Sequence, residues 1–379
     1  MASLTTLATP GGTRRYEERM RGIVAPGHFR TWPGSIENDD AEGTLRLSSL
    51  GMGSYTGPLT QEADEQYRDA VREALRSGIQ VIDCAINYRH MRSERALGEG
   101  IRASIAAGEV ARDEILIMTK GGYLPFDGQA PADPGAYLRK TYFDAGIVDP
   151  AEIVAGSHCI APRYLQDQLE RSLKNFGLEA VDVYFLHNVE QQLDELSRPE
   201  FLSRVEGAFR YLESEADRGR IGMYGVATWN GFRVPADRRD HLELAELFDV
   251  AHRIGGDAHR FRVLQLPYNL GMLEAVNVPS QTVQGQQVPI LVAAQVYGML
   301  TVTSVPLLQG QILRHLPPSF DRMPGLETPA QRALQFARSS PGVHAPLVGM
   351  KTREHVEENA RVAGVAPLGP EQFQEAMGG

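Results

Sequence analysis

The feature that most constrains this chain is a regular alternation of apolar, strand-length segments with amphipathic, helical ones. From residue 79 onward seven strands are expected: residues 79–85, 114–120, 180–188, 221–228, 260–269, 300–305 and 344–350. Strands that are apolar along their whole length are typical of a parallel sheet covered on both faces. An earlier strand within residues 44–54 brings the number to eight. Eight strands, each followed by a helix, predict an α/β fold of the closed (β/α)8 TIM barrel type, with the helices outside.

The segments between the expected strands have the periodicity of helices. In residues 61–78, Tyr67, Val71 and Leu75 fall on one face, and a glycine follows. The expected helices are residues 61–78, 93–108, 162–177, 201–220, 241–255, 289–299, 328–340 and 352–364. An open, doubly wound sheet is the structural alternative. It is disfavoured because no GxGxxG motif follows any strand, and GMGSYTG (51–57) does not fit that motif.

Two segments lie outside the alternation. Residues 1–44 are rich in Gly, Pro, Arg and acidic residues, which predicts an N-terminal extension, loose or draped over the surface, ahead of a barrel domain at residues 45–379. Residues 121–161 form a long insertion, far beyond the usual connection of about 4–6 residues. One interpretation of the insertion is a substrate lid, and the other is a decoration or an oligomer contact. The lid would contain Tyr123, Phe126, Tyr137, Tyr142 and Phe143.

Charge and cysteine content exclude several function classes. The net charge of −10 argues against non-specific nucleic-acid binding, which needs a basic surface. The two cysteines, Cys84 and Cys159, are too few for a disulfide framework and do not have metal-ligand spacing. These features favour a reducing, cytoplasmic environment. Cys84 is interpreted as a core residue, with a catalytic thiol as the weaker alternative.

One uncharged run needs a separate explanation. Residues 288–308 are long enough to span a bilayer, which takes about 20 apolar residues. The run contains Gln295, Gly298 and Pro306, however, and therefore favours a buried helix followed by a strand. The first 22 residues have no apolar core of the kind found in signal peptides. No membrane association is expected.

Titratable residues follow successive strands of the expected barrel. Asp83 ends the second strand with Tyr88 in the loop after it, Lys120 ends the third, and His187 ends the fourth. Each residue alone has a structural explanation, as a turn cap, a packed ring, a solvated strand end or a core histidine. Because active sites of such barrels lie at the C-terminal strand ends, the four residues together predict one site.

The chemistry of the four residues is mutually consistent. A free tyrosine has a pKa of about 10 and is a poor proton donor at neutral pH. A lysine cation beside Tyr88 is expected to lower that pKa, and buried Lys120 needs an anion, which Asp83 supplies. His187 is then available to hold a substrate oxygen through a hydrogen bond. The expected site has no metal.

This pattern resembles the aldo-keto reductase family. The resemblance extends from about residue 45 to about residue 365 and is carried by VIDCAINYRHMRSERALGEGI (81–101), MTKGG (118–122), VDVYFLHN (181–188), LSSLGMGSY (47–55), YGVATWN (224–230), QLPYN (265–269), SVPLLQG (304–310) and VGMKTREHVEEN (348–359). It implies a barrel enzyme that passes hydride from a nicotinamide dinucleotide to a carbonyl. Tyr88 would be the general acid and His187 the orienting group in a tetrad completed by Asp83 and Lys120.

The resemblance also implies cofactor contacts in the loops after several strands. The matching positions are Gly53, Ser54, Tyr55, Asp83, Asn188, Thr228, Gln265, Val305, Leu307, Gln309, Gly349, Met350, Lys351, Thr352, Arg353, His355, Glu358 and Asn359.

Four positions depart from the usual family residues. Ala227 and Thr228 replace a Ser-Asn pair, Ser304 replaces the aromatic residue that stacks on nicotinamide, and His355 replaces an arginine that grips a 2′-phosphate. Lys351 and Arg353 are cations that would substitute for that arginine, so NADP is expected rather than NAD. The alternative for both is a solvated helix start.

The sequence therefore predicts a cytoplasmic NADP-dependent oxidoreductase, with NAD as the alternative cofactor, that acts on an aldehyde, a ketone or the matching alcohol. A second interpretation is a cofactor-binding regulatory subunit of the same fold with little turnover. A third, a metal-dependent barrel hydrolase, lacks an HxH motif or a clustered ligand set. The substrate's identity, the direction of the reaction and the oligomeric state are not encoded in these patterns.

Overall fold

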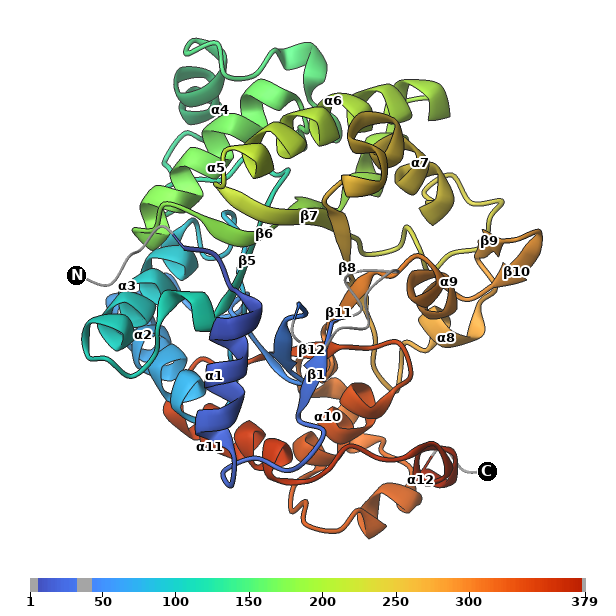
Figure 1. Ribbon diagram of the computed structural model, residues 1–379. Helices are drawn as coiled ribbons and strands as arrows, with labels where there is room; N and C mark the ends of the chain where they lie inside the picture. Colours follow the sequence, from blue (N-terminus) through green and yellow to red (C-terminus); the bar gives the residue numbers. More distant parts are fainter. Residues whose placement is uncertain (1–5, 33–42, 377–379) are drawn as a thin grey trace.

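The computed structural model describes residues 6–32 and 43–376 and contains a closed, eight-stranded parallel barrel. The strand order is β11-β12-β3-β4-β5-β6-β7-β8, and β12 closes the ring against β3 (Figure 1). The barrel strands are β3 (Gly51–Gly53), β4 (Val81–Asp83), β5 (Leu116–Gly121), β6 (Val181–His187), β7 (Ile221–Ala227), β8 (Phe261–Pro267), β11 (Leu300–Ser304) and β12 (Ala345–Gly349). The (β/α)8 prediction is confirmed, and the open-sheet alternative is wrong.

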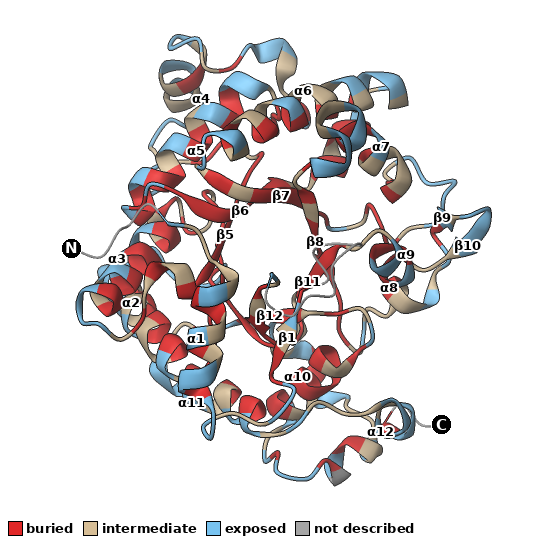
Figure 2. Cartoon of the chain, in the orientation of Figure 1, coloured by how far each residue is buried: buried red, intermediate tan, exposed pale blue. Residues whose placement is uncertain are grey.

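Helices surround the barrel at the positions that the sequence periodicity predicts: α2 (Gln61–Arg76), α3 (Arg92–Ala106), α5 (Pro162–Phe176), α6 (Arg198–Asp217), α7 (Leu244–Gly255), α9 (Ile290–Val296), α10 (Pro329–Ser339) and α11 (Arg353–Ala360). Helices α4 (Pro134–Leu138), α8 (Glu274–Asn277) and α12 (Pro370–Ala376) are additional to those predicted. Buried residues line the faces of these helices that touch the barrel, while the outer faces are exposed (Figure 2). In the described residues no helix is long and apolar enough to cross a membrane.

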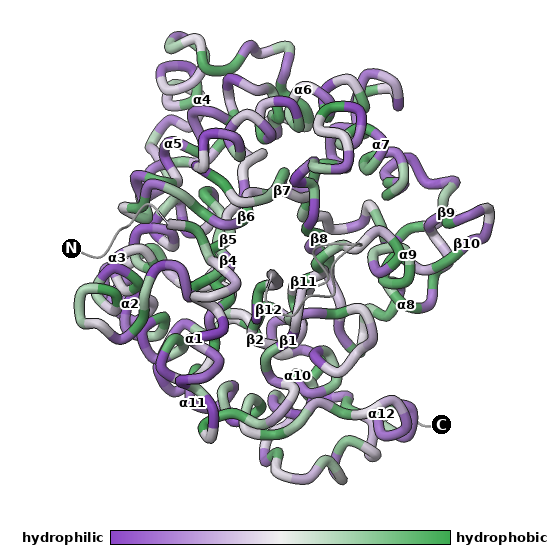
Figure 3. Tube along the Cα trace, viewed as in Figure 1, coloured by the Kyte–Doolittle hydropathy of each residue, from purple (hydrophilic) through white to green (hydrophobic). Residues whose placement is uncertain are grey.

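Apolar side chains fill the barrel interior. Val81, Leu116, Val183, Val263 and Leu300 come from five different strands and belong to one buried cluster. Hydrophobic segments coincide with the barrel wall, and hydrophilic ones gather on the outer helices and loops (Figure 3). The interior is therefore a packed core, which leaves the rim at the strand ends as the place for a ligand.

The predicted first strand is two short strands with different roles. Within residues 44–54, β2 (Arg46–Ser48) pairs antiparallel with β1 (Phe29–Thr31), and only β3 enters the barrel. Trp32, Leu45 and Leu47, from this hairpin, join the buried cluster inside the barrel. The hairpin thus covers the N-terminal end of the barrel, because its partners Val81 and Leu116 lie at the N-terminal ends of β4 and β5.

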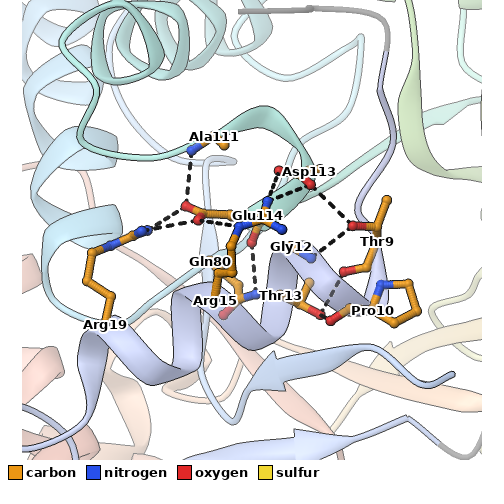
Figure 4. Close-up of polar contacts among 10 residues, drawn as sticks. All are labelled: Thr9, Pro10, Gly12, Thr13, Arg15, Arg19, Gln80, Ala111, Asp113 and Glu114. Carbon is orange, nitrogen blue, oxygen red and sulfur yellow. Dashed lines mark hydrogen bonds and ion pairs between the residues drawn. The ribbon is translucent and has the colours of Figure 1, made fainter. Parts of the chain in front are cut away.

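The expected extension is more ordered than its composition suggests. Residues 33–42 and 1–5 lie outside the described residues, but Pro10–Met20 form helix α1. Thr9 caps this helix by accepting a hydrogen bond from Gly12 N at 2.9 Å. On its outer side, Arg15 donates to both carboxylate oxygens of Asp113 at 2.7 and 2.8 Å, as Figure 4 shows. Polar residues can therefore fix a helix that has little apolar periodicity.

The close approach of α1 to residue 113 explains a glycine in the helix. A Cβ atom at Gly12 would lie 2.1 Å from the Asp113 carbonyl oxygen, whereas one at Gly11 would meet nothing nearer than 3.8 Å. We expect Gly12→Ala to lower the free energy of unfolding by about 1–3 kcal/mol, because the helix must shift to make room. Gly11→Ala is the matched control, and it should cause no loss because alanine favours helix by about 0.5–1 kcal/mol over glycine. Urea denaturation measures both, and equal effects would contradict the packing explanation.

Candidate active site

Three neighbouring strands deliver the predicted catalytic side chains to one rim. Asp83 is the last residue of β4, Lys120 lies near the end of β5, and His187 is the last residue of β6. Tyr88 comes from the loop after β4, and its ring lies 5.9 Å from that of His187, centroid to centroid. The structure therefore brings together all four residues that the sequence singled out.

A buried ion pair is at the base of this group. Lys120 Nζ lies 2.7 Å from Asp83 Oδ1 and 2.8 Å from Oδ2, and it also donates to the Cys84 carbonyl oxygen at 2.7 Å. Both side chains are almost fully buried. Gln265 Nε2 donates to Asp83 Oδ1 at 2.9 Å. An ammonium group has three hydrogens, so these contacts use all of them.

The ion pair affects Tyr88 differently from the sequence prediction. Lys120 Nζ lies 4.8 Å from the centroid of the Tyr88 ring, so it meets the face of the ring as a cation–π contact. Burial raises the pKa of Tyr88 well above its ordinary value, and the nearby Asp83 charge raises it further. The expectation of a lowered pKa is therefore wrong, because burial of the phenol and the charge of Asp83 both raise it. The phenol stays protonated and remains a hydrogen-bond donor.

His187 is held as a neutral imidazole. Burial lowers its pKa well below the ordinary value, and the charge of Lys120 lowers it further. Its Nδ1 atom is buried and has no hydrogen-bond partner among the described residues. A buried N–H without a partner is rarer and more costly than an unpaired lone pair, so we place the ring proton on Nε2.

Three of the four residues border a cavity of about 820 Å³ at the C-terminal rim. Asp83, Tyr88 and His187 line it, and Lys120 lies behind Asp83. The predicted cofactor positions that also line the cavity are Gly53, Ser54, Tyr55, Asn188, Thr228, Gln265, Val305, Leu307, Gln309, Gly349, His355, Glu358 and Asn359. Most of the positions implied by the family resemblance are thus gathered in one cavity.

Four predicted cofactor positions do not line the cavity. Met350 is buried in the core, and Thr352 caps α11 by accepting from His355 N at 3.4 Å. The Arg353 side chain forms an ion pair with Glu73 on α2, with Nη2 to Oε2 at 3.2 Å. The fourth is Lys351, which is half-buried. Residues 350–353 therefore do not line the cavity, although the family resemblance implies cofactor contacts for all four.

The insertion does not cover the cavity. Of its five aromatic residues only Tyr123 lines the cavity, and Tyr142 is buried in a separate small core with Leu124 and Tyr164. The α4 segment lies outside α5 and α6, at the edge of the molecule in Figure 1. Arg204 of α6 donates to the Glu152 carbonyl oxygen at 2.7 Å. The lid interpretation is contradicted for the four aromatic residues beyond Tyr123.

Asn87 and Trp229 are among the lining side chains that were not singled out in the sequence. Asn87 precedes Tyr88, and Trp229 follows β7 with 45% of its side chain exposed. The loop that bears Trp229 is fixed by the buried Glu190 carboxylate, which accepts from the backbone N–H groups of Trp229 at 2.6 Å and Asn230 at 2.9 Å. Trp229 could have been identified from the sequence, because it lies two residues after the end of a barrel strand.

The cysteines have no part in the site. Cys84 and Cys159 are buried and free, and burial raises the pKa of the Cys84 thiol well above its ordinary value. A protonated, inaccessible thiol is a poor nucleophile, so the core interpretation of Cys84 is confirmed. Residues 6–32 and 43–376 contain no group of three or more His, Cys, Asp or Glu side chains placed to hold a metal ion.

Fold and site together define a (β/α)8-barrel protein with a ligand cavity at the C-terminal rim. The model of the Aldo/keto reductase family matches residues 49–235, and this part of the chain is an Aldo/keto reductase domain. L-glyceraldehyde 3-phosphate reductase of Escherichia coli is 32% identical over 149 residues, which are 39% of this chain and 35% of that protein. The matched segment thus spans about a third of that relative's length.

Two further comparisons cover most of the chain. L-galactose dehydrogenase of Arabidopsis thaliana is 23% identical over 351 residues, which are 86% of this chain and 88% of that protein. The crystal structure of an aldo/keto reductase from Klebsiella pneumoniae in complex with NADP and acetate covers 88% of this chain and 91% of that one. Its TM-score is 0.56 at 18% identity, a likeness that supports the barrel fold.

The Asp83–Lys120 pair yields a stability prediction. Asp83→Asn leaves the Lys120 charge buried without its counterion, so we expect the free energy of unfolding to fall by about 3–5 kcal/mol. Asp113→Asn, which removes a carboxylate paired with the exposed Arg15, should cost at most about 1 kcal/mol. Urea denaturation at neutral pH compares the two variants. Similar losses in both would show that the buried pair is not the stronger constraint.

Proposed function

We propose that this protein is a nicotinamide-dependent oxidoreductase that reduces an aldehyde or ketone, or oxidises the matching alcohol. One observation carries the proposal: the protonated phenol of Tyr88 borders the cavity beside the neutral imidazole of His187. Two hydrogen-bond donors of this kind suit an oxygen that gains negative charge during a reaction. The Aldo/keto reductase domain supports the same chemistry.

In this proposal Tyr88 donates its hydroxyl proton to the substrate oxygen as a general acid. A positioned general acid contributes about 10²–10⁴-fold to a rate. His187 Nε2–H orients the same oxygen, and its neutral state avoids placing a second cation beside Lys120. The Asp83–Lys120 pair fixes the face of the Tyr88 ring. The hydride itself would come from the bound nicotinamide dinucleotide.

The residues around the cavity suit a dinucleotide. The volume is within the range of about 300–1,000 Å³ that ligand sites usually have. The lining extends from Tyr88 to His355, Glu358 and Asn359 on α11. In the loop after β11, Val305 has a φ of 49° and Gln309 one of 52°, and both line the cavity. Strained backbone of this kind clusters where proteins clamp ligands.

We further propose NADP(H) as the preferred cofactor, with NAD(H) as the alternative. Arg353 is paired with Glu73. Two other basic residues remain at this end: His355, which lines the cavity, and Lys351, which follows the lining residue Gly349 by two positions. Lys351 lies against Gly57, where a built Cβ would be 3.4 Å from Lys351 Cδ. A small carbonyl compound or alcohol is the proposed partner. A cytoplasmic location stays a prediction.

Replacement of the proposed acid tests the function. The wild-type chain is expected to oxidise NADPH with at least one member of a panel of aldehydes and ketones, measured by loss of nicotinamide absorbance. Tyr88→Phe should lower kcat by about 10²–10⁴-fold, because the donor proton is gone, with the cofactor Kd unchanged. Full activity of the variant would show that Tyr88 is not the general acid. Tight cofactor binding without turnover by the wild type, together with a partner protein in pulldowns, would favour the regulatory-subunit alternative.

Cofactor preference is tested at the start of α11. Lys351→Gln should weaken NADPH binding by about tenfold, since hydrogen bonds to charged groups contribute about 1.5–3 kcal/mol, and should leave NADH binding unchanged. Arg353→Gln is the matched control and should affect neither, because Glu73 already occupies that guanidinium. Tryptophan fluorescence titration measures the four dissociation constants. Equal weakening of NADPH and NADH by Lys351→Gln would contradict a 2′-phosphate contact.

A further inference from the structure

The insertion places a second histidine directly behind His187. His158 is fully buried, and its Nε2 lies 2.6 Å from the His187 carbonyl oxygen. The Tyr123 ring packs edge-on between the two, with its centroid 5.0 Å from that of His158 and 5.2 Å from that of His187. Both Tyr123 and His158 belong to the segment 121–161, so this insertion reaches the site from behind.

The donor chemistry of the neighbours fixes where the His158 proton is. Arg204 Nη1 can only donate, and it donates to Gln192 Oε1 at 2.9 Å. The other end of that amide, Gln192 Nε2, therefore faces His158 Nδ1, 2.8 Å away, and donates to it. With Nδ1 as the acceptor, the ring proton is on Nε2 and points to the His187 carbonyl oxygen. Burial lowers the pKa of His158 to about 4, which keeps the ring in this neutral form.

Backbone pairing within the insertion sets the position of the ring. His158 forms isolated antiparallel bridges with Tyr123 and with Val154. A Cβ atom on Gly122 would lie 2.9 Å from both His158 Nε2 and the His187 carbonyl oxygen, so the contact depends on the glycine beside it. Arg204 holds the far side through the Glu152 carbonyl oxygen. His158 is thus held at both ring nitrogens and through its backbone.

The His187 carbonyl group, which His158 holds, is at the junction between β6 and the loop after it. His187 is the last residue of β6, and the next residue, Asn188, turns into the left-handed region with a φ of 47°. The peptide bond that follows His187 is held at both ends: the Asn188 N–H donates to the Ala227 carbonyl oxygen at 2.5 Å, and His158 donates to the His187 carbonyl oxygen. Loss of the His158 bond would leave the carbonyl end of this peptide without that donor. A shift of that peptide would rotate the imidazole away from Tyr88.

We propose that His158 is a positioning residue that aligns His187 with Tyr88 through its hydrogen bond to the His187 backbone. The role is distinct from catalysis, because His158 does not line the cavity. The kcat test of this inference rests on the proposed function, because it measures turnover. The insertion then has a role that is neither a lid nor a decoration, because its residue His158 supports the position of His187.

Two variants of nearly equal length separate the hydrogen bond from packing. In His158→Gln the amide nitrogen takes the place of Nε2, whereas in His158→Met a methyl group does. We expect His158→Met to lower kcat by about tenfold or more, since misplacement of a catalytic group by about 1 Å can cost about 10²-fold. His158→Gln should recover most of that loss, and both variants should keep the wild-type cofactor Kd.

A second buried histidine provides the matched control. His28 is also fully buried, has a pKa lowered by burial to about 4, and has Nε2 2.9 Å from the Gly78 carbonyl oxygen. It lies at the N-terminal end of the barrel and is not in the cavity. His28→Met should lower the thermal unfolding midpoint while the kcat of the folded enzyme stays the same. If His158→Met behaves like His28→Met, or if His158→Gln is as inactive as His158→Met, the positioning role is overturned.

Nitrogen-15 NMR of histidine-labelled protein separates this inference from the proposed function. The wild-type His158 signal should show the neutral Nε2–H form with no titration between about pH 5.5 and pH 8, because its pKa lies below that range. The His187 signals should shift in His158→Met and return in His158→Gln. If no carbonyl compound is turned over, the proposed function fails while the His187 signals still decide the positioning. Unchanged His187 signals in His158→Met would refute it.

Discussion

The buried ion pair between Asp83 and Lys120 is the interaction on which the site depends. A buried pair of charges is weak evidence for stability, because an apolar pair of similar volume is often as good or better. Here both groups are at strand ends beside the cavity, and three hydrogen bonds satisfy the ammonium group. Their placement therefore indicates a role at the rim. Because the pair is neutral as a whole, it fixes the Tyr88 ring without making the phenol acidic.

That neutrality changes how the proposed chemistry is understood. An isolated cation beside Tyr88 would favour the phenolate and lower its pKa. In the structure, burial raises the pKa of Tyr88, and the charge of Asp83 raises it further. Tyr88 is thus kept protonated. His187 is kept neutral by burial and by the same cation. The site presents two donors to the cavity.

Residues 121–161 show that a long insertion can serve a site without covering it. Its aromatic residues make a small core of their own around Tyr142, and its return toward the barrel delivers Tyr123 and His158 to His187. The length of this segment and its place after the third barrel strand suggested a lid as one of two interpretations. The direction of packing, outward against α5 and α6, depends on contacts such as Arg204 with Glu152 that no local pattern contains.

The sequence by itself determined the barrel, because strand-length apolar runs and helical periodicity are local properties and their alternation admits few architectures. It also determined the rim residues, since a strand's last residue is readable once the strand is recognised. Only the tertiary structure decided which way each side chain faces. Arg353 is paired with Glu73, Met350 is buried, and α1 is fixed by Asp113 through contacts far apart in the chain. The pKa of Tyr88 likewise depends on the balance of burial and two opposite charges, which is set by distances in space.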